Sequence, residues 1–446
     1  MANTYLSKTL SGSPTDNNKW TWSAWVKRSK LTTEQPLFYA DDGGTSYYTR
    51  IQWHDTDQIS VRNRFAGADK GYAITTAMYR DTASWYHLQV VLDTNNATAG
   101  DRLIIYVNGE RVTAFDNNPT ITQNAGSTIN DGYEHRIGRG NNTSGSSYFD
   151  GNMTHIHFVD GQAYAPTVFG ETDSTSGIWK PKTAPSVTYG TNGFFLKMEN
   201  SGAMGTDSSG NSNTFTVSGT LTQNVDTPSN NFATFNPLRP NGISQTYSNG
   251  NNTVIRTGTG GQMNGTLGVK SGKWYYECLI DDYWQYLGWT VLSQNTSQTA
   301  TGASSGSGFY GLYSNATDAL TYANGTGTAQ GSYTAMASGQ IWGIAFDADN
   351  AKMYFSVNGV WENSSDPANQ TNPAMSNIPV TDFLVPAIGQ GTGSRSSTIK
   401  MNFGQGFFGT TAVASANADA NGHGAMEYAV PSGFYTLNTK NLKEFG

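Results

Sequence analysis

Pairs of carboxylates are the residues of this sequence that could do hydrolytic chemistry. Cleavage of a glycosidic bond needs two carboxyl groups about 5–10 Å apart, one on each side of the bond. Glu171 and Asp173 have the two-residue spacing that places two acids on one strand face, but they lie near Pro and Gly, outside any expected strand. Asp281 and Asp282 are adjacent, so in a strand they point to opposite faces. The sequence therefore predicts no catalytic residues and no enzyme, with a glycan-degrading enzyme as the disfavoured alternative.

Two glycine-rich stretches match patterns that elsewhere belong to nucleophile and nucleotide sites. Gly302–Gly306 has the spacing of a nucleophile elbow, and Gly306–Gly311 has that of a dinucleotide-binding turn. Both patterns need a strand before the turn and a helix after it, and no helical pattern follows either stretch. We interpret both as loop sequence.

Two histidines could bind a metal. His155 and His157 are two residues apart in an expected strand and so share a face, but zinc needs at least a third protein ligand, which the sequence does not place. We interpret the pair as facing solvent or an interface.

Calcium is the other metal considered, because loop carboxylates are its usual ligands. The alternative is that these acids only form turns, as Asp beside Gly often does. The sequence predicts no cofactor and no metal, and leaves calcium open at four loop acids: Asp41, Asp42, Asp55 and Asp57.

Aromatic side chains in loops are the candidates for ligand binding. Their rings could stack on sugar faces while Asn, Gln and Asp side chains bond to hydroxyl groups. Most Trp residues lie in expected strands and are expected to form the core. The candidate binding residues are Tyr47, Tyr48, Tyr283, Trp284, Tyr313 and Tyr322.

Composition excludes several classes of protein. The 446 residues carry a net charge of −7 without a basic cluster, which argues against nucleic-acid binding. Aromatic residues make up 12% of the chain, which argues against disorder. The single cysteine, Cys278, excludes an internal disulfide and is expected in the core. No segment is apolar enough to span a membrane and the N-terminus lacks a signal-peptide pattern, so we expect folding in a cytosol, without secretion by a signal peptide.

The strands that must position these residues follow a plan that occurs twice. Asn108-Gly109 and Asn358-Gly359 each sit between two short apolar runs, which is the strongest short hairpin signal. Each hairpin follows a strand that begins with Trp and ends in Asp, namely Trp85–Asp93 and Trp342–Asp347. In Trp20–Val26, alternation puts Trp25 on the face opposite Trp20 and Trp22, so this strand is expected to be covered on both sides.

These patterns predict an all-β protein of two tandem antiparallel β-sandwiches. The expected organisation is a first sandwich over 1–222, a Pro- and Asn-rich connector over 223–240 and a second sandwich with a C-terminal extension over 241–446. Thr410–Ala420 is the best helix candidate.

The first half resembles a laminin-G-like, concanavalin A-like jelly roll, and the second half resembles a SPRY (B30.2) domain. The residues that carry the first resemblance are Trp20–Val26, Trp85–Asp93, Leu103–Val112, His135–Arg139 and Phe149–Gly161. Those that carry the second are Gly272–Glu277, Leu287–Trp289, Gln340–Asp347, Tyr354–Gly359 and Pro386–Gly389. In SPRY domains the ligand surface is formed by loops at one end, which here would include Tyr283 and Trp284.

The connecting stretches resemble a signature of structural proteins of marine tailed bacteriophages. They are Thr206–Asn213, Asn231–Leu238 and Pro431–Leu442. The resemblance implies a virion surface protein, such as a tail fibre, capsid fibre or decoration, that is assembled in the host cytoplasm. Its expected partners are other virion proteins and a host-surface glycan or protein, with a homo-oligomer on the virion and no membrane insertion. The alternative is a purely structural decoration, collar or fibre segment that binds only virion subunits.

Overall fold

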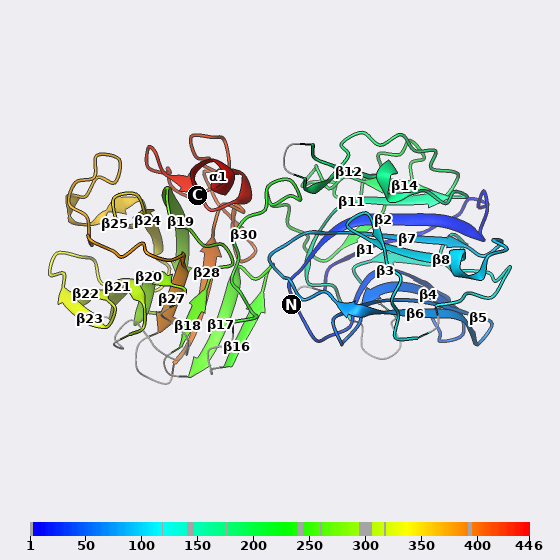
Figure 1. Cartoon of the computed structure of the whole chain (residues 1–446), viewed down its shortest axis with the longest axis horizontal. Coiled ribbons are helices and arrows are strands. Elements are labelled where there is room, and N and C mark those ends of the chain that lie inside the picture. Colours follow the sequence, from blue (N-terminus) through cyan, green and yellow to red (C-terminus); the bar gives the residue numbers. More distant parts are fainter. Residues whose placement is uncertain are drawn as a thin grey trace. The chain divides into compact units, whose positions relative to one another are not determined.

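The chain consists of two compact all-β units, Met1–Gln223 and Asn224–Gly446 (Figure 1). The computed structural model describes residues 3–117, 119–140, 147–174, 177–239, 244–258, 261–293, 306–315, 318–390 and 395–446. In both units the large sheets are antiparallel, apart from Tyr435–Thr436, which pairs parallel with Lys273–Ile280. The prediction of an all-β protein with two antiparallel sandwiches is confirmed. No helix in the described part of the chain is long and apolar enough to cross a membrane.

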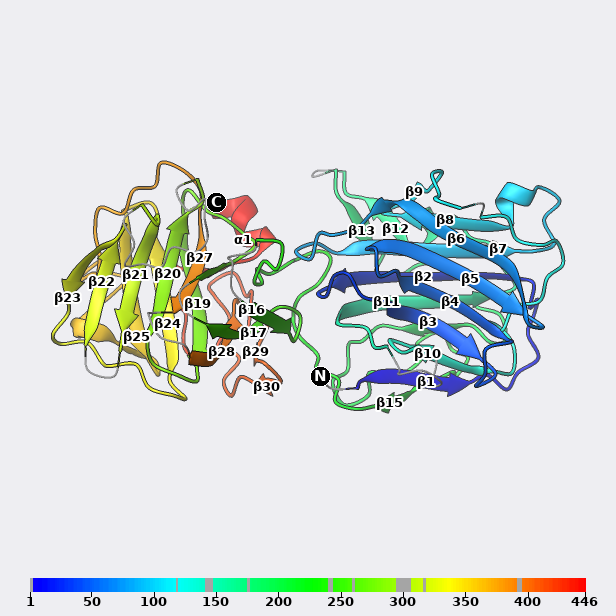
Figure 2. The same cartoon turned by 90° about the horizontal axis from the view of Figure 1, so that it is seen from below.

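The first unit pairs a seven-stranded sheet, in the order β15-β1-β10-β3-β4-β5-β6, with a six-stranded sheet, in the order β14-β11-β2-β7-β8-β9. Figure 2 shows β1, β10, β3, β4, β5 and β6 lying side by side. The elements are β1 (Tyr5–Thr9), β2 (Lys19–Arg28), β3 (Gln35–Asp41), β4 (Tyr48–Trp53), β5 (Gln58–Phe65), β6 (Ala68–Met78), β7 (Tyr86–Asp93), the 3-10 helix η1 (Ala99–Asp101), β8 (Leu103–Val107), β9 (Glu110–Arg111), β10 (Glu134–Ile137), β11 (Gly151–Asp160), the 3-10 helix η2 (Pro166–Val168), β12 (Gly170–Thr172), β13 (Trp179–Pro181), β14 (Phe194–Leu196) and β15 (Thr216–Ser218).

The core of the first unit lies between these two sheets. Trp20 and Trp22 of β2 are fully buried there and pack with Phe38 of β3 and Phe158 of β11. Trp25 points the other way and is also buried, because the residues described between 161 and 191 cover the outer face of the six-stranded sheet. The expected double coverage of β2 is therefore confirmed.

The second unit pairs an eight-stranded sheet, which follows the path β16-β17-β28-β19-β24-β25-β26 with β31 beside β19, with a six-stranded sheet in the order β18-β27-β20-β21-β22-β23. The elements are β16 (Ser244–Ser248), β17 (Thr253–Gly258), β18 (Gln262–Asn264), β19 (Lys273–Ile280), β20 (Gln285–Val291), β21 (Phe309–Ser314), β22 (Ala319–Ala323), β23 (Thr326–Ala329), β24 (Ile341–Asp347), β25 (Lys352–Val357), β26 (Val360–Trp361), the 3-10 helix η3 (Glu362–Ser364), β27 (Leu384–Gln390), β28 (Arg395–Asn402), β29 (Phe407–Phe408), β30 (Thr411–Ala412), β31 (Tyr435–Thr436) and the helix α1 (Thr439–Phe445).

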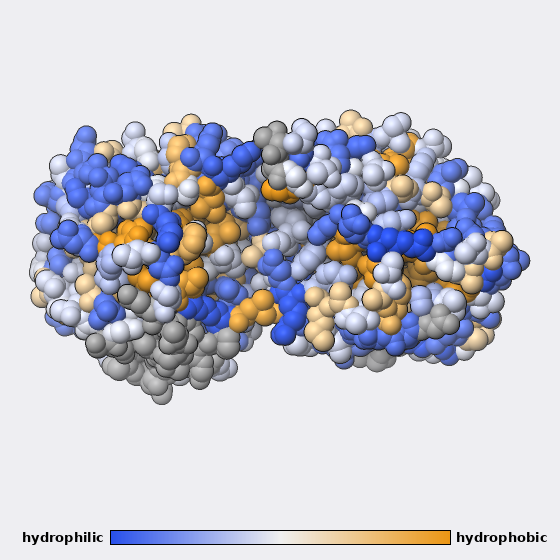
Figure 3. Space-filling model, in the orientation of Figure 1, coloured by the Kyte–Doolittle hydropathy of each residue, from blue (hydrophilic) through white to orange (hydrophobic). Residues whose placement is uncertain are grey.

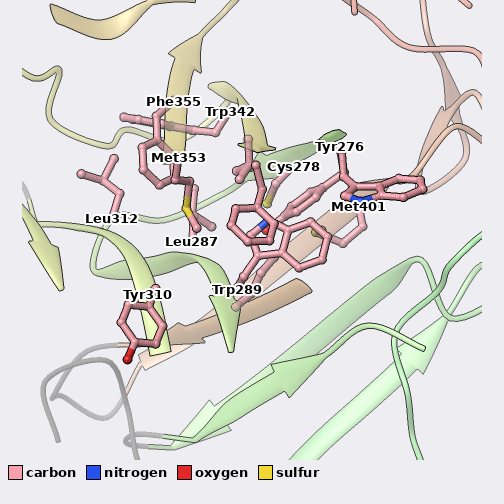
Figure 4. Close-up of a cluster of buried hydrophobic side chains, with 14 of the residues drawn as sticks. Tyr276, Cys278, Leu287, Trp289, Tyr310, Leu312, Trp342, Met353, Phe355 and Met401 are labelled. Atoms are coloured by element: carbon pink, nitrogen blue, oxygen red, sulfur yellow. The ribbon is translucent and has the colours of Figure 1, made fainter. Parts of the chain in front are cut away.

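The core of the second unit is drawn in Figure 4. Trp289 of β20 faces Tyr276 of β19, with a ring-centroid distance of 5.8 Å, and Trp342 is fully buried nearby. Cys278 is buried in the same cluster, as expected, and burial raises the pKa of its thiol.

The residues that precede the first strand of the second sandwich are part of its core. Phe232, Ala233 and Phe235 lie within the expected connector but are buried in the second unit, where the Ala233 N–H bonds to the carbonyl of Leu437 at 3.0 Å. The structure thus differs from a free connector over 223–240, because these apolar side chains fill the core rather than link two domains.

The C-terminal extension covers the outer face of the eight-stranded sheet. Met426 and Phe434 pack there on Tyr275 and Tyr354. The expected helix at Thr410–Ala420 is wrong: this stretch holds the two-residue strand β30, and the α-helix is α1, which Asn438 caps through the Asn441 N–H. Most residues of this stretch are exposed, so it has no buried face of the kind that would stabilise a helix.

The two Asn-Gly hairpins form as predicted. Both residues of each turn have positive φ: Asn108 50° and Gly109 85°, Asn358 47° and Gly359 82°. In each turn the Asn side chain accepts the backbone N–H of the residue just before the first pair with the preceding strand, His87 at 2.9 Å and Ile341 at 2.9 Å.

Candidate functional site

The outer face of the seven-stranded sheet in the first unit carries a row of arginines and tyrosines. Strand pairing places Tyr39 of β3 beside Arg50 of β4, Arg50 beside Arg62 of β5, and Arg62 beside Tyr72 of β6. Their strand neighbours, such as Ile51 and Val61, point to the core. We call the cluster of Tyr39, Tyr48, Arg50, Arg62 and Tyr72 on this side of the sheet the arginine–tyrosine face. Tyr39 and Tyr48 are buried, whereas Arg50, Arg62 and Tyr72 are half-buried.

Ring and guanidinium contacts organise this face around Tyr48. The rings of Tyr39 and Tyr48 are stacked at 6.1 Å. The guanidinium carbons of Arg50 and Arg62 lie 5.7 and 5.6 Å from the centroid of the Tyr48 ring, and that of Arg62 lies 4.9 Å from the Tyr72 ring. Such cation–π contacts fix the long arginine side chains in place. Tyr72 is half-buried, so part of its ring stays open to solvent.

Acidic groups neutralise this face unevenly. Asp69 accepts two hydrogen bonds from Arg62, at 2.9 and 2.7 Å, and an ion pair from Arg64 at 3.4 Å. These guanidinium groups lower the pKa of Asp69. Within the described residues, the one ion pair of Arg50 is with Glu34, at 3.8 Å. The face therefore presents donors in excess of acceptors around Arg50.

The four loop acids considered for calcium have other partners. Asp41 is buried and pairs with Arg136 at 2.9 and 3.2 Å. Asp57 is buried and pairs with Arg28 at 2.9 Å. Asp42 accepts the backbone N–H of Gly44, as expected for an acid that only forms a turn. Asp55 pairs with His54.

Calcium binding by this set is not supported, because arginine already neutralises its two buried carboxylates. Among the described residues, no three His, Cys, Asp or Glu side chains are grouped as metal ligands.

The two tyrosines proposed near the start of the chain differ in position. Tyr48 was expected in a loop but begins β4 and belongs to the arginine–tyrosine face, where only 9% of its surface is exposed. Tyr47 points away from Tyr48 and packs against Phe65 and Tyr133. The structure therefore joins one of the two to the site.

In the second unit, Tyr313 and Tyr322 also lie in strands, β21 and β22, and not in loops. Both pack on Tyr286 of β20, with ring centroids 4.5 and 5.4 Å away, in a small aromatic cluster outside the main core. The structure thus brings these two candidates together with Tyr286, which was not among the predicted binding residues.

Tyr283 and Trp284 do lie in a loop, the one that leads into β20. Their rings are 6.2 Å apart, and both residues are half-buried. The backbone N–H of Trp284 donates a hydrogen bond to the backbone carbonyl of Ser314 at 2.8 Å, which fixes the loop to β21.

The histidines do not form a metal pair. The register is irregular between Thr154 and His157, and His155 has a φ of 48°. Both imidazole rings pack on Phe195, with ring centroids 5.9 Å away for His155 and 4.0 Å away for His157. His157 is buried, stacks on Phe195 at 4.0 Å and contacts the Tyr189 hydroxyl at 2.9 Å. Burial holds the pKa of His157 well below its usual value. The solvent or interface interpretation is wrong for His157, because the covering residues around Tyr189 come from later in the same unit.

The acids considered for hydrolysis are also partnered. Glu171 lies in β12, contrary to expectation, and both it and Asp173 pair with Lys180, at 3.7 and 2.9 Å. Asp281 accepts the N–H of Thr398 at 2.6 Å. Of the glycine motifs, Gly302–Ser305 lies outside the described residues, and Gly306–Gly311 leads into strand β21, not into a helix.

Sequence reasoning missed Arg50, Arg62 and Tyr72. A signal was present, because Arg50 and Arg62 alternate with the core residues Ile51 and Val61 in their strands. Their meeting across β4 and β5 depends on strand register, which the spacing alone does not define.

Comparisons with known proteins find similar solved structures and one matching family model. Two solved structures are similar to the chain in fold alone: the SPRY domain of human HERC1, at 16% identity over 37% of this chain and 96% of that one, and the TRIM65 PSpry domain, at 16% identity over 38% and 91%, both with a TM-score of 0.29. A search of curated protein sequences finds no match. Residues 3–168 match the family model Laminin_G_3, described as the concanavalin A-like lectin/glucanases superfamily. The first unit therefore carries a concanavalin A-like, laminin-G-like domain over residues 3–168.

Proposed function

We propose that this protein binds glycans without cleaving them, and that the arginine–tyrosine face is its binding surface. The observation that carries the proposal is the row Tyr39, Arg50, Arg62 and Tyr72 on an outward sheet face of a domain that matches the lectin/glucanase superfamily. Tyrosine rings offer flat apolar surface to a sugar, and guanidinium groups donate several hydrogen bonds in a fixed geometry. The surface is a rigid sheet, so little ordering is needed on binding.

The proposed mechanism is recognition by stacking and hydrogen bonding. Tyr72 is the half-exposed ring of the face and would stack on a sugar ring. Arg50 and Arg62 would donate to the oxygen atoms of the sugar, with the ring of Tyr48 holding both guanidinium groups in position. The carboxylates beside this row, Glu34, Asp41 and Asp69, are in ion pairs with arginine, which supports binding rather than hydrolysis.

A glycan array with the full chain and the Tyr72→Ala variant tests the proposal. We expect the wild-type protein to bind at least one glycan class, the variant to lose that binding, and its thermal unfolding to change little. Incubation with the bound polysaccharide should release no reducing sugar, with or without Ca²⁺ or Zn²⁺. Release of reducing sugar that one Asp or Glu substitution abolishes would overturn the non-enzymatic part of the proposal.

We also propose a setting, the surface of a tailed-phage virion, where several copies would engage a host surface together. Support comes from the sequence signature in Thr206–Asn213 and Pro431–Leu442. Copies on one particle would make weak single-site binding effective through multivalency. Antibody labelling of purified particles, imaged at low resolution, tests this setting: label on the tail or capsid supports it, and its absence from particles contradicts it.

The alternative is a structural role in which the chain binds only other virion subunits. The aromatic cluster of Tyr286, Tyr313 and Tyr322 in the second unit favours it, since Tyr313 and Tyr322 are only half-buried. Under this alternative, the double variant Tyr313→Ala/Tyr322→Ala would fail to join particles, whereas Tyr72→Ala would assemble normally and leave host binding unchanged. The double variant Tyr283→Ala/Trp284→Ala tests the remaining loop candidates in the same two assays.

A further inference from the structure

Arg50 and Arg62 face each other on neighbouring strands, although both carry a positive charge. Their Cα atoms are register partners on β4 and β5, and both guanidinium groups lie within 6 Å of the centroid of the same ring, that of Tyr48. Like charges placed directly opposite each other on a sheet destabilise the strand pair. The Tyr48 ring, Glu34 and Asp69 offset part of this repulsion, and an anion bound between the two side chains would offset more of it.

The carboxylates around this pair do not neutralise all of the positive charge of the nearby arginines. Asp69 forms ion pairs with both Arg62 and Arg64. Arg136 forms ion pairs with both Asp41 and Glu134. Glu34, the remaining acid near the row, stands 3.8 Å from Arg50 and also accepts a hydrogen bond from Gln52 at 3.0 Å. Three arginines, at positions 50, 62 and 64, thus share two carboxylates, and this positive region lies on a protein whose net charge is −7.

Arg50 also keeps unused hydrogen-bonding capacity. Its Nε atom is shielded from solvent and has no hydrogen-bond partner within the part of the chain that the structure describes. A guanidinium group binds a carboxylate or sulfate through two parallel hydrogen bonds, one of which commonly comes from Nε. The Arg62 Nε atom already bonds in this way, to Asp69 at 2.9 Å. Because the Nε atom of Arg50 is shielded, a ligand anion would have to bind the exposed part of this side chain, which is 16% exposed, rather than Nε itself.

We propose that the arginine–tyrosine face selects acidic glycans, with a carboxylate or sulfate group bound by Arg50 beside Arg62. This proposal rests on the glycan-binding function proposed above and adds the chemical class of the ligand. The half-exposed ring of Tyr72, 4.9 Å from the Arg62 guanidinium, is close enough to contact the sugar that carries the charged group. Neutral glycans would lack the group that Arg50 requires.

Affinity electrophoresis of the full chain tests this selectivity, in native gels that contain polygalacturonate, dextran sulfate or neutral dextran. We expect retardation by an anionic polymer and none by dextran, and the first two gels distinguish carboxylate from sulfate. The Arg50→Gln variant should bind about tenfold more weakly, the loss expected for one charge-assisted contact. Binding should also weaken as NaCl rises from about 0.05 to about 0.5 M, because salt screens exposed charges.

Arg111→Gln is the matched control, since Arg111 is an exposed strand arginine of the same unit that pairs with Asp101 at 2.8 Å. It should bind as the wild type does. Arg50→Gln should unfold at the same temperature as the wild type or a higher one, because it removes a like-charge contact.

Three outcomes would contradict the proposal. Equal loss in Arg50→Gln and Arg111→Gln, or equal binding of double-stranded DNA, would mean that total charge and not this face controls retention. Unchanged binding by Arg50→Gln would mean that the acidic group of the glycan does not bind at Arg50. Binding of neutral dextran that depends on Tyr72 but not on Arg50 would overturn the acidic selectivity and leave the glycan-binding function standing, whereas failure to bind any glycan would overturn both.

Discussion

The indole of Trp179 donates a hydrogen bond from Nε1 to Nδ1 of His87 at 2.9 Å. Because Nδ1 is the acceptor, the ring proton of the neutral imidazole lies on Nε2, which contacts the Ser23 hydroxyl at 2.8 Å. Burial lowers the pKa of His87 to about 3, so the ring is neutral across the physiological range. The indole also lies 3.1 Å from where a Cβ of Gly109 would stand, so it closes over the Asn-Gly turn.

Replacing Trp179 with Phe should therefore destabilise the first unit. The variant removes the N–H donor and leaves the buried Nδ1 acceptor of His87 unpaired, at a cost of about 1–3 kcal/mol in the free energy of unfolding. Urea unfolding of the full chain measures it. Tyr106→Phe, at a half-buried aromatic residue of strand β8, is the control and should cost much less. Equal stability of wild type and Trp179→Phe would mean that the hydrogen bond contributes nothing.

The buried histidines predict that the first unit loses stability in mild acid. Burial lowers the pKa of His87 to about 3 and that of His135 to about 4, whereas an unfolded histidine titrates near 6.5. Their stabilising effect is complete above pH 6.5 and is lost as the pH falls toward 3–4, because only the unfolded chain then takes up the protons. The expected slope is about 1.4 kcal/mol per pH unit for each histidine. Pulse proteolysis in urea at pH 7 and pH 5, with fragments assigned by mass, reports each unit. A first unit that is equally stable at both pH values would contradict this prediction.

The stability of the second unit should depend on pH in the opposite direction, because of Glu277. Its carboxylate accepts the N–H groups of Glu427 and Tyr428, each at 2.8 Å, and so holds the C-terminal extension on the sheet. Burial raises the pKa of Glu277 to about 7, although these hydrogen bonds lower it. The raised value means that the folded state binds the proton more tightly, so this contribution is complete below about pH 4.5 and is lost as the pH rises through 7.

The Glu277→Gln variant should remove that pH dependence. The amide resembles the protonated carboxyl group that the wild type carries at pH 5, so we expect the free energies of unfolding to differ there by no more than about 1 kcal/mol. Pulse proteolysis at pH 5 and 7 measures both effects, and the first unit of the same molecule is the internal control. A variant whose second unit keeps the wild-type slope would show that another group titrates.

Two fragments of the second unit should differ sharply in stability. The fragment 224–446 keeps Phe232 and Phe235, whose side chains are 1% exposed, and should fold by itself. The fragment 241–446 lacks both and leaves two large cavities, each costing about 3–5 kcal/mol. Circular dichroism and thermal unfolding of the two fragments measure this difference. If 241–446 were as stable as 224–446, the residues before 241 would not be part of the core.

Local features of the fold could be read from the sequence because their causes are local. The Asn-Gly turns need only two residues that tolerate positive φ, and Trp25 could be assigned to the second face of β2 from alternation alone. The candidate site was predicted only in part. Tyr48 was found through its residue type, but it was assigned to a loop, and its neighbours Arg50, Arg62 and Tyr72 were not found.

By itself, the sequence determined the all-β class, the two sandwiches, the hairpins and the aromatic cores, since period-two alternation and turn chemistry act over a few residues. Only the tertiary structure decided that His157 is covered, that Phe232 and Phe235 belong to the second core, and that Arg50 stands opposite Arg62. Each of these depends on which distant strands pair and in which register. A shift of one residue would turn Arg50 and Arg62 toward the core, so the register that buries Ile51 and Val61 is also what builds the arginine–tyrosine face.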